Sequence, residues 1–113
     1  MENCLFCKIV RGEIPSSKVY EDDKVLAFNY IDPKAPTHIL IIPKKHIASI
    51  AALEDQDCEL VAHIVRTAKQ LAVDKGLDNG FRLVANTGRD GGQTVNHLHF
   101  HLLGGRAFGW PPG

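Results

Sequence analysis

Three histidines alternate with apolar residues in the segment 97–103, His97-Leu98-His99-Phe100-His101-Leu102-Leu103. Such alternation is typical of a β-strand with one face in the core, so it predicts that the three imidazoles share the other face. Histidine has an unperturbed pKa of about 6.5 and can act as a nucleophile, an acid or a base near neutral pH. The segment therefore predicts a reaction centre.

Two other interpretations of these histidines are less favoured. A single histidine on a strand is usually a surface or core residue, but three in register form a cluster of titratable groups, which favours a site. A strand rises about 3.3 Å per residue, so the first and third rings begin roughly 13 Å apart. One zinc ion needs nitrogens at about 2.0–2.1 Å and cannot readily bind all three.

A glycine-rich loop, 86–94, comes just before the histidines with the sequence Asn-Thr-Gly-Arg-Asp-Gly-Gly-Gln-Thr. Glycines allow successive backbone N–H groups to turn toward an anion, and Thr94 adds a hydroxyl donor. Alone, such a loop is more often an ordinary turn. Its position beside the histidines favours a phosphate site instead, where a neutral imidazole attacking phosphorus would form a covalent nucleotidyl-histidine.

The periodicity along the 113 residues predicts a single α+β domain, 1–113, with helices layered on an antiparallel sheet. A short helix is expected over Cys4–Val10 with Asn3 as its cap, and a long helix over 55–75 before Gly76. The long helix has an apolar stripe that includes Val65, while His63 falls off the stripe and is expected to be solvated. Strands are expected over 18–21, 24–30, 37–42 and 81–87, in addition to the histidine segment.

Composition excludes several classes of function. The formal net charge is zero and the pI is about 7.0, so we expect no nucleic-acid partner and no anionic membrane surface. No apolar run reaches the ~20 residues of a membrane span, and the first residues lack the pattern of a signal peptide, which predicts a cytoplasmic protein. Of three cysteines, Cys4 and Cys7 have a spacing that suggests metal or redox chemistry.

The chain resembles the histidine triad family, in particular its nucleotide-binding proteins. Besides the His-x-His-x-His segment, the resemblance rests on 35–38 (Ala-Pro-Thr-His), 42–47 (Ile-Pro-Lys-Lys-His-Ile), 90–94 (Asp-Gly-Gly-Gln-Thr) and 110–113 (Trp-Pro-Pro-Gly). It implies the HIT-like fold, a five-stranded antiparallel sheet with one long and one short helix. It also implies a homodimer across which the sheet is extended.

The resemblance further implies hydrolysis of purine nucleoside 5′-phosphoramidates, which releases a nucleotide of the AMP or GMP type and an amine without a catalytic cofactor. His99 would be the nucleophile. His101 and His38 would lie around the phosphate and the leaving group, and Thr94 would add its hydroxyl. The implied nucleotide-binding set combines apolar base-pocket residues with polar phosphate ligands: Phe6, Ile9, Phe28, Ile31, Leu40, Asn86, Gly92, Gln93, Thr94, His99 and His101.

Many bacterial members of the family bind zinc through residues equivalent to Cys4, Cys7, His46 and His97. A closed Cys2His2 set is typical of a structural zinc site, so the resemblance implies a structural zinc ion. The alternative is that both thiols are reduced and partly buried.

The largest departure from the family is Tyr30, which stands where an aspartate usually binds both ribose hydroxyls. Asp32, two residues on, would point to the same side in an extended segment and is the candidate replacement. Two alternative functions stay open at this point. One is a purine nucleotide-binding module with little turnover, and the other is a thiol redox protein built on Cys4 and Cys7.

Overall fold

The computed structural model describes residues 3–113, so the first two residues of the expected 1–113 domain lie outside the described part of the chain. Along the sequence the elements are α1 (Leu5–Val10), β1 (Lys18–Glu21), β2 (Val25–Asn29), β3 (Thr37–Pro43), two 3-10 turns (Ile50–Ala52 and Asp55–Asp57), α2 (Cys58–Asp74), β4 (Phe81–Val84) and β5 (Phe100–Gly104).

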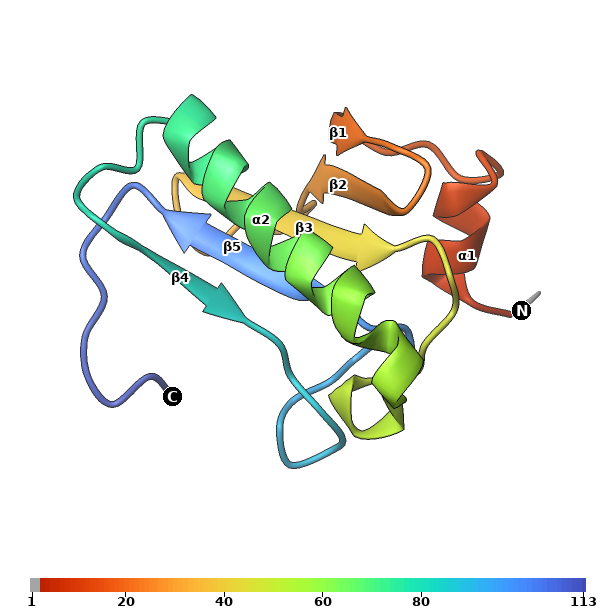
Figure 1. Cartoon of the computed structure of the whole chain (residues 1–113). Coiled ribbons are helices and arrows are strands. Elements are labelled where there is room, and N and C mark those ends of the chain that lie inside the picture. The colour runs from red at the N-terminus through yellow and green to blue at the C-terminus, as the bar shows by residue number, and fades with distance from the viewer. Residues whose placement is uncertain (1–2) are drawn as a thin grey trace.

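The strands form one five-stranded sheet in the order β1-β2-β3-β5-β4, and all neighbouring strands are antiparallel. The long helix α2 crosses one face of this sheet, and α1 lies near one end of it (Figure 1). This arrangement confirms the predicted α+β class, with one long and one short helix on a five-stranded antiparallel sheet.

Alternating residues of the central strands build a core on each face of the sheet. One core lies under α2 and includes Val25, Ile39, Ile41, Phe100 and Leu102. The other packs against α1 and joins Phe6 and Ile9 to Leu26, Phe28, Leu40 and Ile42. Because Leu40 pairs with His101 and Ile41 pairs with Phe100, the register places His101 on the α1 face and Phe100 under α2.

The long helix follows its predicted stripe with one exception. Ile64, Ala68 and Leu71 are buried, but Val65 is 47% exposed, so its inclusion in the stripe was wrong. The segment 55–57 is a 3-10 turn, and Asp57 accepts the Glu54 backbone N–H at its start. The helix ends just before Gly76, whose φ of +69° suits glycine at this position.

Several expected boundaries differ from the structure, and three of them lie near the histidines, the glycine-rich loop and the cysteines. The histidine strand begins only at Phe100, because the Leu98 N–H donates to the Ile47 carbonyl at 2.6 Å and draws 97–99 away from regular pairing. The strand expected over 81–87 ends at Val84. The cap of α1 is Cys4 rather than Asn3, with its Sγ accepting the Cys7 N–H at 3.3 Å.

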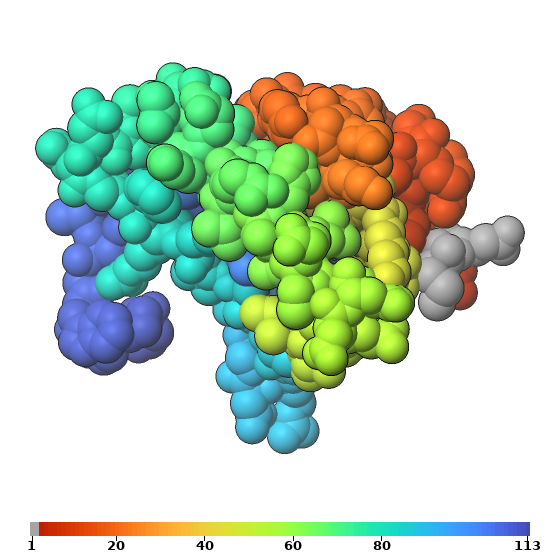
Figure 2. All heavy atoms as spheres, viewed as in Figure 1, coloured from red at the N-terminus to blue at the C-terminus, as the bar shows by residue number. Residues whose placement is uncertain are grey.

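The segment around residue 90, light blue in Figure 2, projects from the body of the molecule, and the C-terminal residues extend along another edge. Within the projecting loop, a Cβ on Gly91 would collide with the Thr87 carbonyl oxygen, so the loop closes tightly only with glycine there. Among the helices of residues 3–113, none combines the length and the apolar character needed to cross a bilayer.

Candidate active site and metal cluster

His99 lies directly before β5, on the α1 face of the sheet, at the wall of a cavity of about 710 Å³. Its Nδ1–H donates to the backbone carbonyl of His97 at 2.7 Å. The neutral ring therefore keeps its lone pair on Nε2, the nitrogen that is not committed to the backbone. An imidazole held in this tautomer can act as a nucleophile through Nε2.

His38 and His101 form a second, hydrogen-bonded pair of imidazoles, with His38 Nε2 and His101 Nδ1 2.9 Å apart. The backbone N–H of Lys34 donates to His38 Nδ1 at 3.0 Å, so that nitrogen must accept. The neutral His38 ring then carries its proton on Nε2 and donates it to His101 Nδ1. His101 in turn carries its own proton on Nε2 and can donate it outward.

The electrostatic environment keeps this pair uncharged at neutral pH. Burial, followed by the neighbouring His99 and His38, lowers the pKa of His101 to about 4. Burial also lowers the pKa of His38, and the Lys34 ammonium adds to that effect while Asp32 opposes it. The pair can therefore present an N–H donor to the cavity without carrying a positive charge.

The second cluster of side chains brings Cys4 and Cys7 of the α1 region to His46 and His97. His97 Nδ1 lies 3.2 Å from Cys4 Sγ, 3.6 Å from Cys7 Sγ and 3.2 Å from His46 Nδ1, and Cys7 Sγ lies 3.3 Å from His46 Nδ1. All four donor atoms fall within 4.8 Å of one another. Tetrahedral zinc places such donors roughly 3.3–3.8 Å apart, so the spacing fits one ion.

The protonation states of the cluster also fit a metal. His97 Nε2–H donates to the Pro43 carbonyl at 2.8 Å, which leaves the Nδ1 lone pair facing the sulfurs. Burial lowers the pKa of His97 to about 4, which keeps it a neutral ligand. Burial, with the neighbouring Cys4, raises the pKa of the Cys7 thiol, and a cation in the cluster would reverse this by stabilising the thiolate.

A family model described as the HIT domain matches residues 11–108. The chain belongs to the HIT domain family. A crystal structure of a HIT family hydrolase from Legionella pneumophila Philadelphia 1 is 59% identical, covers 98% of this chain and 100% of its own, and superposes with a TM-score of 0.97. These matches confirm the resemblance to the histidine triad family.

The names of two further relatives state what those proteins bind. A maize protein described as a 14 kDa zinc-binding protein is 50% identical over 96% of this chain and 87% of its own length. A histidine triad nucleotide-binding protein from Candida albicans is 38% identical, with a TM-score of 0.83 over 96% of this chain and 83% of the other.

The cavity of this HIT protein is lined by most of the residues expected to bind a nucleotide. Its lining is mainly apolar and includes eight of the predicted residues, Phe6, Ile9, Phe28, Ile31, Leu40, Thr94, His99 and His101. Ile31 is 96% exposed and so lies at the rim rather than in the interior. An apolar slot ending at imidazoles is suited to a flat ring with a polar group attached.

Four residues expected to bind the nucleotide lie outside the cavity lining, within the described part of the chain: Asp32, Asn86, Gly92 and Gln93. The Asp32 carboxylate is 73% exposed and pairs with the Lys34 ammonium at 2.7 Å. The Gln93 amide donates to the carbonyls of Ala48 and Val95 and accepts the Gly88 N–H. Gln93 therefore holds the glycine-rich loop together.

Several lining residues were not predicted. Ser17 and Asn29 are hydrogen-bonded to each other at 3.0 Å and line the cavity together with Ile14, Ser16, Tyr30 and Val95. Tyr30 also places its ring centroid 4.5 Å from that of His38. The sequence offered one signal for this contact. If the two expected strands over 18–21 and 24–30 pair as a hairpin, Ser17 comes close to Asn29.

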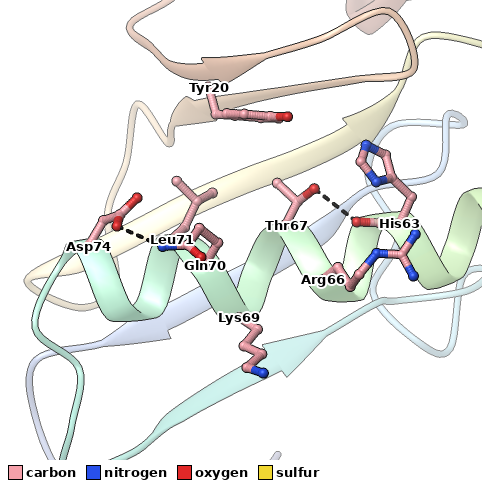
Figure 3. A pocket seen from close by; sticks show the side chains of 8 residues that line it. All are labelled: Tyr20, His63, Arg66, Thr67, Lys69, Gln70, Leu71 and Asp74. Atoms are coloured by element: carbon pink, nitrogen blue, oxygen red, sulfur yellow. Dashed lines mark hydrogen bonds between the residues drawn. The ribbon is translucent and has the colours of Figure 1, made fainter.

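A separate cavity of about 350 Å³ lies between β1 and α2, on the other face of the sheet from the imidazoles (Figure 3). Its lining combines Tyr20 with long polar side chains of α2, such as Arg66 and Gln70. His63, expected to be solvated, donates from Nε2 to Asp22 at 2.7 Å and is half-buried, so that expectation was wrong. This pair ties α2 to the β1–β2 turn.

Proposed function

We propose that this HIT protein hydrolyses purine nucleoside 5′-phosphoramidates and releases a nucleoside monophosphate and an amine. The observation that carries the proposal is the tautomer of His99, whose Nδ1–H is committed to the His97 carbonyl while Nε2 is free at the cavity wall. The descriptions of the Legionella relative as a hydrolase and of the Candida relative as nucleotide-binding support it.

In the proposed mechanism the purine occupies the apolar slot between Phe6, Phe28 and Leu40, and the phosphate lies against His99 and His101. His99 Nε2 forms a bond to phosphorus, and the P–N bond breaks. The amine leaves with that electron pair and takes a proton supplied by solvent. The product of this step is a nucleotidyl group bound to His99.

His101 would donate its Nε2–H to a phosphate oxygen, where negative charge is concentrated as the bond to His99 forms. His38 and the Lys34 backbone N–H orient this donor. Because the donor is neutral and fixed before the substrate binds, little reorganisation is needed during the reaction. Thr94 lines the same cavity and would add a hydroxyl donor.

Water then completes the reaction by a second displacement. Its oxygen bonds to phosphorus, the bond to His99 Nε2 breaks, and the proton is returned to solvent. Over both steps one water molecule is consumed, and His99 returns to its starting tautomer.

We also propose that the cluster of Cys4, Cys7, His46 and His97 binds a structural zinc ion. The donor spacing and protonation states support this, as does the zinc-binding description of the maize relative. The ion would tie α1 to His46, which follows β3, and to His97, which precedes β5. Elemental analysis should then find about one zinc per chain, and metal-free protein of undiminished stability would contradict the proposal.

A homodimer is the proposed assembly. The edge strand β4 has β5 on one side, and its first residue, Phe81, is 43% exposed. On α2, Val65 and Val73 are 47% and 62% exposed. An exposed edge and apolar groups beside it favour pairing with a second copy.

Cytoplasmic location stays a prediction from the sequence.

The hydrolase proposal is tested with a panel of nucleoside 5′-phosphoramidates that vary in base, sugar and amine. Release of the nucleoside monophosphate is measured by chromatography, and binding of AMP and GMP is measured by calorimetry. We expect turnover of purine substrates. Binding of AMP or GMP without turnover would favour a nucleotide-binding module, and neither binding nor turnover would overturn the proposal.

A further inference from the structure

Phe6 lies in α1, between Cys4 and Cys7 in the sequence. These two cysteines, with His46 and His97, form the proposed metal site, called the metal cluster below. Cys4 caps the helix by accepting the Cys7 N–H at 3.3 Å, and both thiols face His97. A ligand that holds these sulfurs therefore fixes the helix on which Phe6 is carried.

The Phe6 side chain faces the metal cluster and the cavity at once. It is only 5% exposed, and its ring centroid lies 5.8 Å from that of His97 and 5.1 Å from that of His99, in edge-to-face contact with both. It makes a similar contact with Phe28 at 5.8 Å. One side chain thus contacts a proposed metal ligand, the proposed nucleophile and the wall of the proposed base pocket.

The helix that carries Phe6 has only six residues. Helices of this length are not stable by themselves, so their position depends on tertiary contacts. For α1 these contacts are the apolar cluster around Phe6 and Ile9 and the attachment of Cys4 and Cys7 to the metal cluster. When the cluster binds no metal, the second group of contacts is weaker and Phe6 is less firmly held.

We infer that Phe6 is a positioning residue that couples metal binding at the Cys2His2 cluster to nucleotide binding in the cavity. The metal fixes α1, and Phe6 then fixes the base-pocket wall and the edge of the His99 ring. This inference rests on the proposed function of the cavity as a nucleotide site. Coupling between two ligands is reciprocal, so the nucleotide must strengthen metal binding by the factor by which the metal strengthens nucleotide binding.

The test measures binding rather than turnover and uses AMP, the proposed product. The affinity of the full chain for AMP is measured by calorimetry with and without zinc. The zinc affinity is measured by competition with a chromophoric chelator, with and without saturating AMP. We expect each ligand to raise the affinity of the other by the same factor, about fivefold or more.

Two variants separate Phe6 from the rest of the cavity. Phe6→Ala should reduce the coupling factor to near one. Ile14→Ala removes another apolar side chain from the same cavity, and Ile14 lies outside α1. It should weaken AMP binding and retain the coupling. A Phe6→Ala protein with undiminished coupling would overturn the role of this residue.

A second measurement starts from zinc-loaded protein and does not require the metal-free chain to fold. AMP should slow the release of zinc to excess chelator severalfold in the wild type but not in Phe6→Ala. If AMP binds and changes neither the affinity nor the release rate of zinc, the inference is wrong and the proposed function stands. If zinc-loaded protein binds no AMP, the proposed nucleotide site itself is wrong.

Discussion

His97 and His99 are two residues apart, and each donates one ring N–H to a backbone carbonyl, but they use opposite nitrogens. His97 donates from Nε2 to Pro43 and leaves Nδ1 facing two sulfurs. His99 donates from Nδ1 to His97 and leaves Nε2 at the cavity. The backbone partner of each ring therefore decides which nitrogen is available for chemistry.

Burial does not distinguish the two rings, since His97 is 0% and His99 is 4% exposed. The difference lies in what the available nitrogen faces. For His97 it faces Cys4, Cys7 and His46 in a closed set, which is typical of a structural metal ligand. For His99 it faces an open cavity, which is required of a nucleophile that must reach a substrate.

The largest expected effect comes from His99→Ala. We expect turnover of phosphoramidates to fall by roughly 10⁴-fold or more, because the proposed nucleophile is lost. No labelled nucleotidyl adduct should form when the variant is mixed with substrate and quenched. Circular dichroism and zinc content should match the wild type. Near-normal turnover would contradict the mechanism.

Cys4→Ser tests the environment of His97, the proposed metal site. We expect the variant to purify without zinc and to lose about 4 kcal/mol of unfolding free energy relative to wild type with zinc at a thousand times its Kd. Urea unfolding with and without added zinc measures this loss. Cys58→Ser is the matched control, because Cys58 is exposed and lies outside the cluster. Equal zinc content in both variants would exclude Cys4 as a ligand.

Tyr30→Asp tests sugar recognition beside the reaction centre. Tyr30 lines the cavity against His38, and Asp32 pairs outside it with Lys34, so we expect the wild type to discriminate weakly between ribose and 2′-deoxyribose substrates. A carboxylate at position 30 should restore ribose preference by roughly ten- to a hundredfold in kcat/KM, because a hydrogen bond to a charged group contributes about 1.5–3 kcal/mol.

Asp32→Ala is the control for this experiment and should leave the wild-type ratio unchanged. A strong ribose preference in the wild type that disappears in Asp32→Ala would show that the carboxylate has moved two residues along the chain. The expectation for Tyr30 would then be wrong.

The smallest expected effect is on the pH dependence of stability. Burial lowers the pKa of His101 to about 4, whereas in the unfolded chain it is about 6.5. Below pH 6.5 the unfolded chain therefore binds a proton that the folded protein does not, and stability falls as the pH drops toward 4. Urea unfolding at pH 7.5 and 5 should show this fall, and His101→Asn should reduce it. An unchanged fall in His101→Asn would contradict the buried, neutral state of this ring.

The sequence was sufficient for the elements that obey simple periods. Alternation and the 3.6-residue period placed the central strands and α2, and the family resemblance brought Cys4 and Cys7 to His46 and His97. Alternation failed at His97, because a tertiary hydrogen bond from Leu98 to Ile47 ends the regular strand before it.

Other features of the site also depended on contacts between distant segments. The Gln93 amide donates to the Ala48 carbonyl, 45 residues earlier in the chain, and no local pattern specifies that partner. The same is true of the His97 ring, because its Nε2–H donates to the Pro43 carbonyl at the end of β3, 54 residues earlier in the chain. The sequence could predict which residues take part in the chemistry. It could not predict which atom of each residue is available for it.

The most direct test of the opposite tautomers is a long-range ¹H–¹⁵N spectrum of the imidazole rings in the zinc-loaded protein at neutral pH. We expect His99 to carry its proton on Nδ1, with Nε2 unprotonated, and His97 to carry its proton on Nε2, with Nδ1 bound to the metal. His99→Ala and His97→Ala spectra would assign the two sets of signals. A His99 ring protonated on Nε2 would contradict the proposed mechanism, because the nitrogen proposed to attack phosphorus would have no free lone pair.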